Sequence, residues 1–572
     1  MSADYEVMGN TAAALFTLKA HRGEGMVLLA MDWKVAPPPA DFVGFAIEYQ
    51  EPRGDTFFPV KNRLGFPTAG GGADATSLES TLSPIQKFRW VHFPRNAELE
   101  GEFVYRVSPV FMDEQSELRA GTPQEVAIEL RRETYPGQLN VAFTRGFVSS
   151  QAFVEKYQSE AEPISTLLPT NADDGLTFTP THPKAAEALP WMGFEARSAI
   201  LEVLDQAIAD TSAKVCVVAY DLNEPGVVSR LEQLGSRVRV IIDDDGAHGQ
   251  ADSAEHQAEE RLVVSAGRAN VKRQHMGHLQ HNKTIVVDGP RTQTAVGGST
   301  NHSWRGFFVQ ANNAVVLHGE TPVARFTEAF EGYWNNDGAA GFAATPASKM
   351  ADLGLSGIDG GVAFSPHSAD DALLETIAAD IRDNTTSSLL YSLAFLSQTP
   401  GPILDAITAV TAKDDIFVYG ISDRKTGGIA VQTPSGNVEP VFASALGKNV
   451  PEPFKSESTG GSGIRMHHKF VVIDFDKPTA RVYFGSYNFS GSADLQNGEN
   501  LFLIKDRRIA VSYAVEALRI FDHYHFRVAQ KAAGASHEPL VLARPPRDQS
   551  EKPWWDRYYS DPQRVRDREM FA

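Results

Sequence analysis

Two copies of one residue pattern form the group most able to do chemistry in this sequence. In each copy a lysine follows a histidine by two residues, an aspartate follows it by seven, and an asparagine follows it by 20 or 21. The residues are His281, Lys283, Asp288 and Asn301 in the first copy and His467, Lys469, Asp474 and Asn488 in the second. Two such matches in one chain are very improbable by chance, so the pattern is a strong signal.

The residue types suit transfer of a phosphoryl group. Both motifs lie in apolar runs, and residues two apart on a strand leave the same face, so each histidine is expected to project beside its lysine. Ammonium and amide groups can donate to non-bridging phosphate oxygens and stabilise charge that develops in the transition state. One neutral imidazole could attack phosphorus while the other, protonated, delivers a proton to the leaving oxygen.

The remaining motif residues are expected to support this centre. Asp288 and Asp474 lie at an odd offset from their histidines, so on a regular strand they point the other way and are expected to brace the strand end and its turn. Gly298 and Gly485 allow close approach of the backbone.

These motifs resemble those of the phospholipase D superfamily, which carries two H-x-K-x4-D motifs, each followed by G-S-x-N. The resemblance covers roughly residues 190–535. The second copy, which runs on through residues 497–500 (Asn-Gly-Glu-Asn), is close to the small bacterial nucleases of that superfamily. The first copy, with Gly289 after its aspartate and two glycines before Ser299, looks more like the phospholipase and cardiolipin synthase side. The resemblance implies a phosphohistidine intermediate and no metal or other cofactor.

The resemblance also assigns partners to the two histidines. Glu499 and Asn312 each lie 11 residues after a motif asparagine, and in the superfamily these positions orient the histidine of the opposite lobe. By that resemblance Glu499 would bond His281 and Asn312 would bond His467. A carboxylate supports the positive charge that builds on an attacking imidazole, so His281 is the expected nucleophile and His467 the expected general acid.

The predicted site therefore has three groups of residues. The catalytic set is His281, Lys283, Asn301, His467, Lys469, Asn488 and Glu499, the substrate-binding set is Ser299, Ser486 and Asn312, and the structural set is Asp288, Asp474, Gly298 and Gly485.

Alternating helices and strands surround both motifs. Apolar periodicity predicts helices at 199–208, 227–234, 373–381 and 403–410 and strands at 214–220, 238–242, 389–396 and 416–419. This alternation is typical of βα units on a mixed or parallel sheet. Because the order recurs, we expect two similar α/β lobes, at residues 191–348 and 349–535.

The segments outside the lobes are expected to differ in kind. Residues 1–150 show short alternating strands separated by Pro and Gly clusters, including glycines 70–72, which predicts an all-β sandwich loosely like fibronectin type III or immunoglobulin domains. No chemical grouping appears there, which favours binding or scaffolding with no partner indicated. Residues 151–190 are a predicted linker, and 536–572 a tail whose aromatic residues pin it to its own domain.

Composition narrows the class of protein. The 572 residues carry 53 basic and 72 acidic side chains, a net charge of −19, which argues against indiscriminate binding to nucleic acid or anionic membrane. The one cysteine excludes a disulfide framework or a cysteine-rich metal cluster. An acidic first segment and the lack of any run near 18 apolar residues predict no signal peptide, no transmembrane segment and a cytoplasmic protein.

Weaker metal signals have simpler interpretations. The spacing of His275, His278 and His281 could suggest a metal site, but the third belongs to the strand motif and the first two are expected to line the approach to it. Residues 243–245 (Asp-Asp-Asp) are expected to form a polar loop after a strand. His468 is expected to face the other side of its strand and to be structural.

Two functions that differ in substrate class are compatible with these residues. The first is a phospholipase D-type enzyme that hydrolyses a phospholipid or transfers its phosphatidyl group, favoured by the acidic charge and the first motif. The second is a metal-independent nuclease, favoured by the second motif, which would need a basic groove at the site. The local basic candidates for such a groove are Arg261, Arg268, Lys272 and Arg273. A binding module that has lost catalysis is disfavoured because both His-Lys pairs are intact.

Overall fold

The computed structural model folds into two compact units. The first contains described residues of 1–132 and 511–572, and the second those of 133–432 and 438–510. The structure describes residues 4–35, 37–67, 78–130, 133–146, 153, 156–157, 159, 161–394, 396, 400–423, 429–432, 438–441, 466–536, 540–548 and 550–572. Glycines 70–72 and part of the expected linker lie outside these residues.

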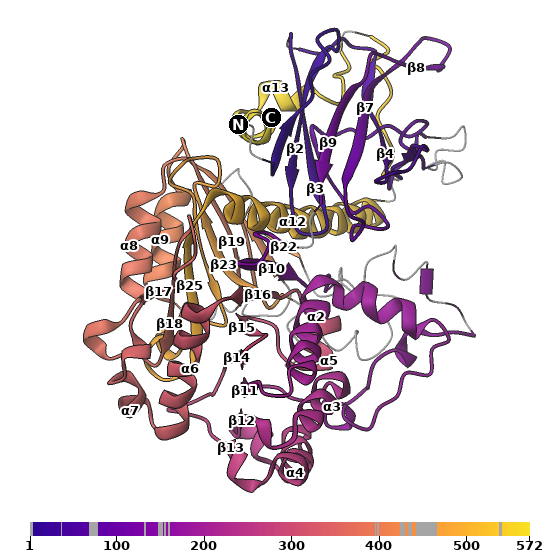
Figure 1. The fold of residues 1–572 in the computed structure, drawn as a ribbon. Coiled ribbons are helices and arrows are strands. Elements are labelled where there is room, and N and C mark those ends of the chain that lie inside the picture. Colours follow the sequence, from indigo (N-terminus) through magenta and orange to yellow (C-terminus); the bar gives the residue numbers. More distant parts are fainter. Residues whose placement is uncertain are drawn as a thin grey trace. The chain divides into compact units, whose positions relative to one another are not determined.

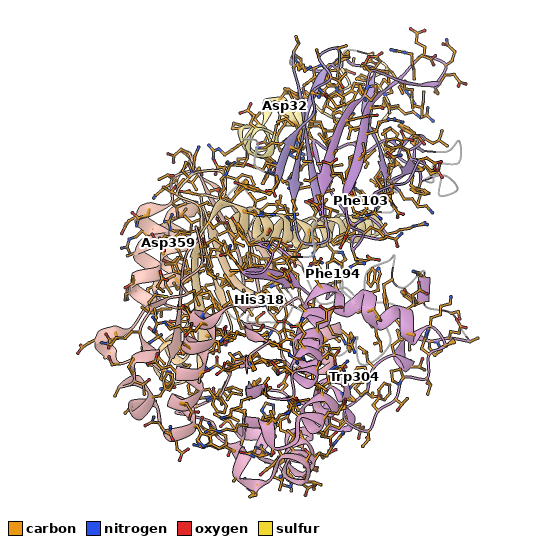
Figure 2. The ribbon with its side chains drawn as sticks, viewed as in Figure 1. Asp32, Phe103, Phe194, Trp304, His318 and Asp359 are labelled. Atoms are coloured by element: carbon orange, nitrogen blue, oxygen red, sulfur yellow. The ribbon has the colours of Figure 1, made fainter. Side chains whose placement is uncertain are left out.

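Two antiparallel sheets share one core in the first unit. The four-stranded sheet has the order β1 (Glu6–Met8), β2 (Phe16–Arg22), β3 (Val27–Trp33), β6 (Arg89–His92). The other has the order β5 (Phe58–Pro59), β4 (Phe42–Gln50), β7 (Glu102–Met112), β8 (Leu118–Ala120), with β9 (Gln124–Glu129) also paired to β7. Phe103, labelled in Figure 2, is fully buried in a cluster that takes Phe16 from one sheet and Phe45 from the other.

The C-terminal segment packs against this β-structure. It contains the short helices α13 (Arg557–Ser560) and α14 (Pro562–Phe571). The Trp554 ring stacks on Phe88 with centroids 5.3 Å apart, and its indole N–H donates to the Phe42 carbonyl at 2.9 Å. Phe571 is fully buried. The aromatic residues therefore hold the tail to residues 1–132.

The second unit contains two sheets with the same central strand order. In lobe 1, which we define by the first of these sheets, the order is β10 (Leu139–Phe143), β16 (Asn313–His318), β15 (Gln293–Gly298), β14 (Lys283–Asp288), β11 (Lys214–Ala219), β12 (Val238–Ile242), β13 (Val271–Arg273). Strands β11, β12 and β13 are parallel to one another, and the other neighbours are antiparallel. Its helices are α2 (Ala185–Ala209), α3 (Pro225–Leu234), α4 (Ala254–Ala266), α5 (Trp304–Phe308) and α6 (Glu320–Asn335).

Lobe 2, defined by the other sheet, repeats this arrangement (Figure 1). Its order is β17 (Ala351–Asp352), β18 (Asp359–Ser365), β25 (Glu499–Lys505), β24 (Arg481–Gly485), β23 (Lys469–Ile473), β19 (Ser388–Leu393), β20 (Phe417–Asp423), β21 (Ile429–Gln432), β22 (Val438–Val441). The helices that follow lobe 1 are α7 (Ala339–Ala343), α8 (Leu374–Asn384), α9 (Pro402–Thr411), α11 (Gly491–Leu495) and α12 (Arg507–Ser536). The run β16-β15-β14-β11-β12 corresponds to β25-β24-β23-β19-β20, so the predicted recurrence is present.

Three boundaries differ from those expected. Strand β10 lies before residue 150 but pairs with β16, so it belongs to the sheet of lobe 1. Within the expected linker, Ile164, Leu167 and Leu168 are buried in the core of lobe 1, which the polar composition of that stretch concealed. Helix α12 continues to Ser536, and its residues from Val511 onward belong to the first unit rather than to lobe 2.

A helix that spans a lipid bilayer needs both length and an apolar surface. None of the helices in the described part of the chain combines the two to the extent that crossing a membrane requires.

Candidate active site

The two motif strands bring both histidines into one buried centre within the second unit. His281 and His467 directly precede β14 and β23, and each side chain is at most 5% exposed. The centroids of the two imidazole rings are 6.1 Å apart. Residues 186 positions apart in the sequence are thus close enough to act on one small group.

Each imidazole is held through Nδ1 by a residue of the opposite lobe. His281 Nδ1 lies 2.7 Å from Glu499 Oε2, and His467 Nδ1 lies 2.8 Å from Asn312 Oδ1. Both expected hydrogen bonds are therefore present. Because Nδ1 is occupied in each ring, Nε2 is the nitrogen left for a substrate.

The amide at Asn312 fixes the tautomer of His467. Its Nδ2 donates to the Gly306 carbonyl at 2.9 Å, so Oδ1 is the atom that faces the ring. An amide oxygen only accepts, and His467 Nδ1 must therefore carry the hydrogen. Nε2 of this ring therefore carries a lone pair when the ring is neutral, and it carries a hydrogen that it can donate when the ring is protonated.

Both motif lysines lie in the same centre. Lys283 and Lys469 are at most 1% exposed, and each ammonium donates to the carbonyl of its own motif histidine, at 2.8 Å for Lys469. Burial lowers the pKa of Lys283 to about 7 and that of Lys469 well below its usual value. A buried ammonium loses hydration, and a bound anion would restore its charged form.

Burial and these lysines also act on the imidazoles and on Glu499. Burial, followed by the charges of the two lysines, holds the pKa of both His281 and His467 well below the usual range. Burial raises the pKa of Glu499 to about 8. These pKa shifts favour the neutral forms of the lysines, the imidazoles and Glu499. A bound phosphate would instead favour protonated lysines and a protonated imidazole.

The two motif asparagines differ. Asn301 Nδ2 donates to Asp221 Oδ2 at 2.7 Å, whereas Asn488 forms no such hydrogen bond to a carboxylate among the described residues. The buried Oδ1 atoms of both asparagines have no hydrogen-bond partner among these residues. Sequence reasoning did not include Asp221. The available signal was its place just after the strand that pairs with the first motif strand, where Ala219 lies opposite Lys283.

The serines of the expected substrate-binding set form hydrogen bonds to other residues of the site. Ser299 Oγ donates to Asn312 Oδ1 at 3.0 Å and accepts from the Asn313 backbone N–H at 3.0 Å. Ser486 Oγ accepts from the Asn500 backbone N–H at 2.9 Å. Ser299, Ser486 and Asn312 are all fully buried, and their expected role in substrate binding stays a prediction.

Gly298 and Gly485 stand where a side chain has no room. Their φ angles are +119° and +145°, a backbone conformation that favours glycine. A Cβ at Gly298 would lie 2.6 Å from the Asn313 carbonyl oxygen, and one at Gly485 would collide with the Asn500 carbonyl oxygen. The structural role expected for both glycines has this physical basis.

Only one of the two motif aspartates braces its strand. Asp474 is fully buried and accepts from the backbone N–H groups of Thr386, Ser387 and Ser388 at 2.9, 2.8 and 3.2 Å. Burial acts to raise its pKa, but these hydrogen bonds lower the pKa overall. Asp288 is exposed instead, and the bracing role expected for it is wrong because the nearby turn is held by a different carboxylate, Asp210.

The structure also shows where two other histidines from the sequence analysis lie. His275 is more than half exposed and its Nδ1 lies 2.8 Å from Asp244 Oδ1. His468 is fully buried, with its ring beside those of Phe143 and Phe470 at 5.8 and 5.2 Å, which fits a structural residue.

Comparison with known families and proteins gives matches in both lobes. A family model described as "Cardiolipin synthase, PLD-like domain" matches residues 204–334 and 379–521, one segment for each motif. Phospholipase D of Rickettsia prowazekii (strain Madrid E) is 49% identical over 47 residues, 8% of this chain and 21% of the relative. Phospholipase D of Rickettsia felis is 45% identical over 47 residues, again 8% of this chain and 22% of the relative. The chain thus spans about a fifth of the length of these relatives.

Solved structures that match the chain include the following two. Phosphatidylserine synthase of Haemophilus influenzae Rd KW20 gives a TM-score of 0.40 at 11% identity, over 66% of this chain and 93% of that chain. Nuc from Salmonella typhimurium, described as a phospholipase D family member, gives 0.20 at 24% identity, over 24% of this chain and 87% of that chain.

Proposed function

Because the chain belongs to the phospholipase D superfamily through residues 204–334 and 379–521, we propose that it cleaves or exchanges a phosphodiester through a phosphohistidine. The observation that carries this proposal is the pair of buried imidazoles with ring centroids 6.1 Å apart, each anchored through Nδ1 and flanked by a motif lysine. Such a pair can supply both a nucleophile and an acid to one phosphorus.

In the first step Nε2 of His281 forms a bond to phosphorus while the bond from phosphorus to the leaving oxygen breaks. The proton on Nε2 of His467 moves to that oxygen, so the product leaves as an alcohol. Lys283 and Lys469 offset the negative charge of the non-bridging oxygens.

In the second step His467 acts as a base. Its Nε2 takes a proton from water, the water oxygen bonds to phosphorus, and the bond from phosphorus to His281 breaks. A small alcohol in place of water gives an exchanged phosphodiester. No step needs a metal ion, because histidine and lysine side chains supply the charges.

The different partners of the two rings support the assignment of His281 as nucleophile. An attacking imidazole becomes positive, and Glu499 can accept that charge through the 2.7 Å contact at Nδ1. His467 has only the amide of Asn312 there, which suits a ring that must lose and regain a proton.

For the substrate we favour a phospholipid over nucleic acid. The four basic residues that could have formed a groove for a nucleic acid are all engaged in ion pairs with nearby carboxylates. The pairs are Arg261 with Glu232, Arg268 with Glu259, Lys272 with Asp337, and Arg273 with Glu259. Neutralised side chains release few counterions from a polyanion and so add little affinity.

For the first unit we propose a sandwich of the fibronectin type III or immunoglobulin kind with a binding or scaffolding role. Its two antiparallel sheets around one aromatic core support this proposal.

An assay of purified protein against phosphatidylcholine vesicles, single-stranded DNA and double-stranded DNA, with and without EDTA, tests the function. We expect choline release, transfer to added ethanol, and turnover that persists in EDTA. Loss of all turnover in chelator with recovery on adding one divalent ion would contradict the mechanism. Intact phospholipid beside nicked DNA would move the substrate to nucleic acid and leave the phosphohistidine chemistry standing.

A further inference from the structure

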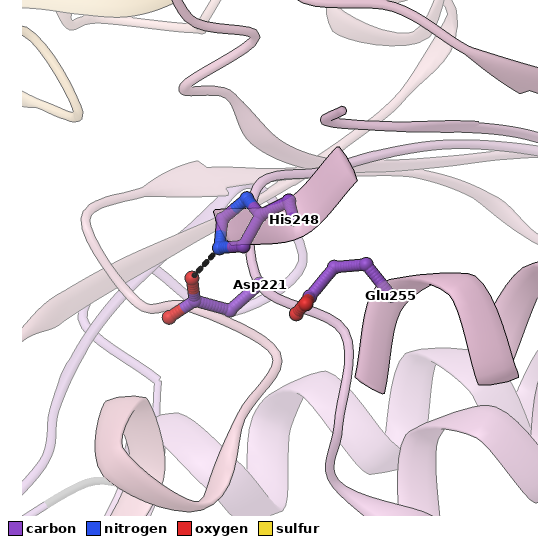
Figure 3. A group of neighbouring side chains, drawn as sticks. All are labelled: Asp221, His248 and Glu255. Atoms are coloured by element: carbon purple, nitrogen blue, oxygen red, sulfur yellow. Dashed lines mark ion pairs between the residues drawn. The ribbon is translucent and has the colours of Figure 1, made fainter. Parts of the chain in front are cut away.

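A second group of chemistry-bearing side chains lies in lobe 1 beside the catalytic centre. It consists of Asp221 in the loop after β11, His248 in the turn Gly246–Gly249, and Glu255 in the first turn of α4 (Figure 3). One ligand atom from each lies within 4.8 Å of the other two. The mechanism above uses none of the three.

His248 is held so that one nitrogen faces this group. Its Nδ1 lies 2.8 Å from Asp243 Oδ2, and Asp243 is fully buried and also accepts from the Gln280 backbone N–H at 2.7 Å. This leaves Nε2, which lies 3.3 Å from Asp221 Oδ1. A carboxylate behind the far nitrogen of a histidine is the common support of a metal-binding imidazole.

Glu255 gives an independent reason to expect a cation. It is 4% exposed, and among the described residues its carboxylate forms no ion pair within 4.0 Å, although a nitrogen of His248 lies within 4.8 Å. Its Oε1 accepts one hydrogen bond, from the Leu222 backbone N–H at 3.1 Å. Figure 3 shows its carboxylate directed toward Asp221. Buried carboxylates are normally paired with a cation or bound to a metal ion.

We propose that Asp221, His248 and Glu255 bind one divalent transition-metal ion, Zn²⁺ in preference to Mg²⁺ or Ca²⁺. Two ligands at about 2.0–2.1 Å from a tetrahedral ion lie about 3.3 Å apart, which matches the His248–Asp221 separation. One imidazole with two carboxylates suits zinc, whereas Mg²⁺ and Ca²⁺ select oxygen ligands. A water completes the fourth position.

The site lies in lobe 1 and adjoins the catalytic centre through Asp221 and through the Tyr220 ring, whose centroid lies 4.6 Å from that of His248 and 4.7 Å from that of His281. The second oxygen of Asp221 accepts from Asn301 Nδ2 at 2.7 Å. The ion would thus fix the acceptor that orients Asn301, without taking part in the reaction.

Calorimetric titration of the chelator-stripped full chain with ZnCl₂, MnCl₂ and MgCl₂ tests the site, together with the metal content after dialysis. We expect one Zn²⁺ per chain, weaker Mn²⁺ and no measurable Mg²⁺. His248→Gln and Glu255→Gln should each abolish the stoichiometric zinc. Asp243→Asn should weaken zinc binding by about 10- to 100-fold.

Two matched controls locate the ion. His256→Gln alters a partly exposed histidine of the same helix α4 and should keep one Zn²⁺, as should His281→Asn, which removes an imidazole of the proposed catalytic pair. Zinc that is retained by both His248→Gln and Glu255→Gln, or that is lost in His281→Asn, would overturn the proposal, as would no zinc bound by the native chain. Binding is measured without turnover, so a failure of the proposed enzymatic function leaves this result intact.

Discussion

The two lobes share a strand order but hold their motif strands in different ways. In lobe 2, Asp474 at the end of β23 accepts from the backbone between α8 and β19. In lobe 1 the direction is reversed, because Asp210 at the end of α2 accepts from the backbone N–H of Arg291, which follows β14, at 2.9 Å. The bracing carboxylate thus lies at the end of the motif strand in lobe 2 and at the end of a helix in lobe 1. A repeated sheet can keep its reacting groups in place while the supporting residues diverge.

The divergence extends to the centre itself. His281 has a carboxylate partner and His467 has an amide, and only Asn301 is tied to an acidic residue. This asymmetry is the basis on which we propose two different roles for the two histidines.

The largest expected effect comes from removing one or the other histidine. His281→Asn should abolish the covalent adduct with an activated phosphodiester, because it removes the nucleophile. His467→Asn should slow turnover by about 10²–10⁴-fold but let an adduct accumulate on His281 when the leaving group departs unprotonated. Intact-protein mass spectrometry with peptide mapping distinguishes the two. An adduct on His467 that still forms in the His281→Asn protein would reverse the roles.

The next effect concerns the partners of the rings. Glu499→Gln keeps an acceptor beside His281 but removes the charge, so adduct formation should slow on the order of 100-fold. Asn312→Asp adds a charge beside His467 and should raise the pKa of that ring, which shifts the pH profile of turnover upward. Rapid-quench measurement of adduct formation and the pH dependence of turnover test the pair. Equal slowing by both changes, without a pH shift, would argue against distinct roles.

A smaller effect is expected for anion affinity against pH. With the pKa of Lys283 lowered to about 7 and that of Glu499 raised to about 8, the empty centre loses positive charge and gains negative charge as pH rises through this range. A bound anion favours the protonated forms, so binding takes up protons and affinity for tungstate should fall from pH 6.5 to 8.5. Calorimetry in buffers of different ionisation enthalpy measures the uptake. Affinity that rises with pH would contradict these shifts.

The sequence predicted which histidines and lysines come together better than it predicted the residues that support them. The spacing of His281, Lys283, His467 and Lys469 was sufficient to predict that each histidine lies beside its lysine, because residues two apart on a strand must share a face. The strand 238–242 was predicted at its observed bounds because its apolar run is continuous. The role of Asp288 was predicted wrongly because the motif does not reveal which side of a junction carries the bracing carboxylate.

Contacts between distant segments were harder to predict. Strand β10 joins lobe 1 through pairing with residues at least 170 positions away, as in Leu139 opposite Leu317, and nothing local in its alternation specifies that partner. Asp221 was missed because its significance depends on Asn301, His248 and the strand register together.

The smallest expected effect compares the two motif aspartates by stability. Asp474→Asn replaces a buried acceptor of three backbone N–H groups by an amide with one acceptor oxygen, which should lower the free energy of unfolding by about 1–3 kcal/mol. Asp288→Asn changes an exposed side chain and should stay within about 0.5 kcal/mol of the native protein. Because the pKa of Asp474 is lowered in the folded state, its contribution is present above its unfolded pKa and is lost as pH falls through the folded value. Chemical denaturation of both variants at neutral and acidic pH measures this. Equal destabilisation by the two changes would mean that the motif aspartates brace both lobes alike, and the contrast between the lobes would then be confined to the histidine partners.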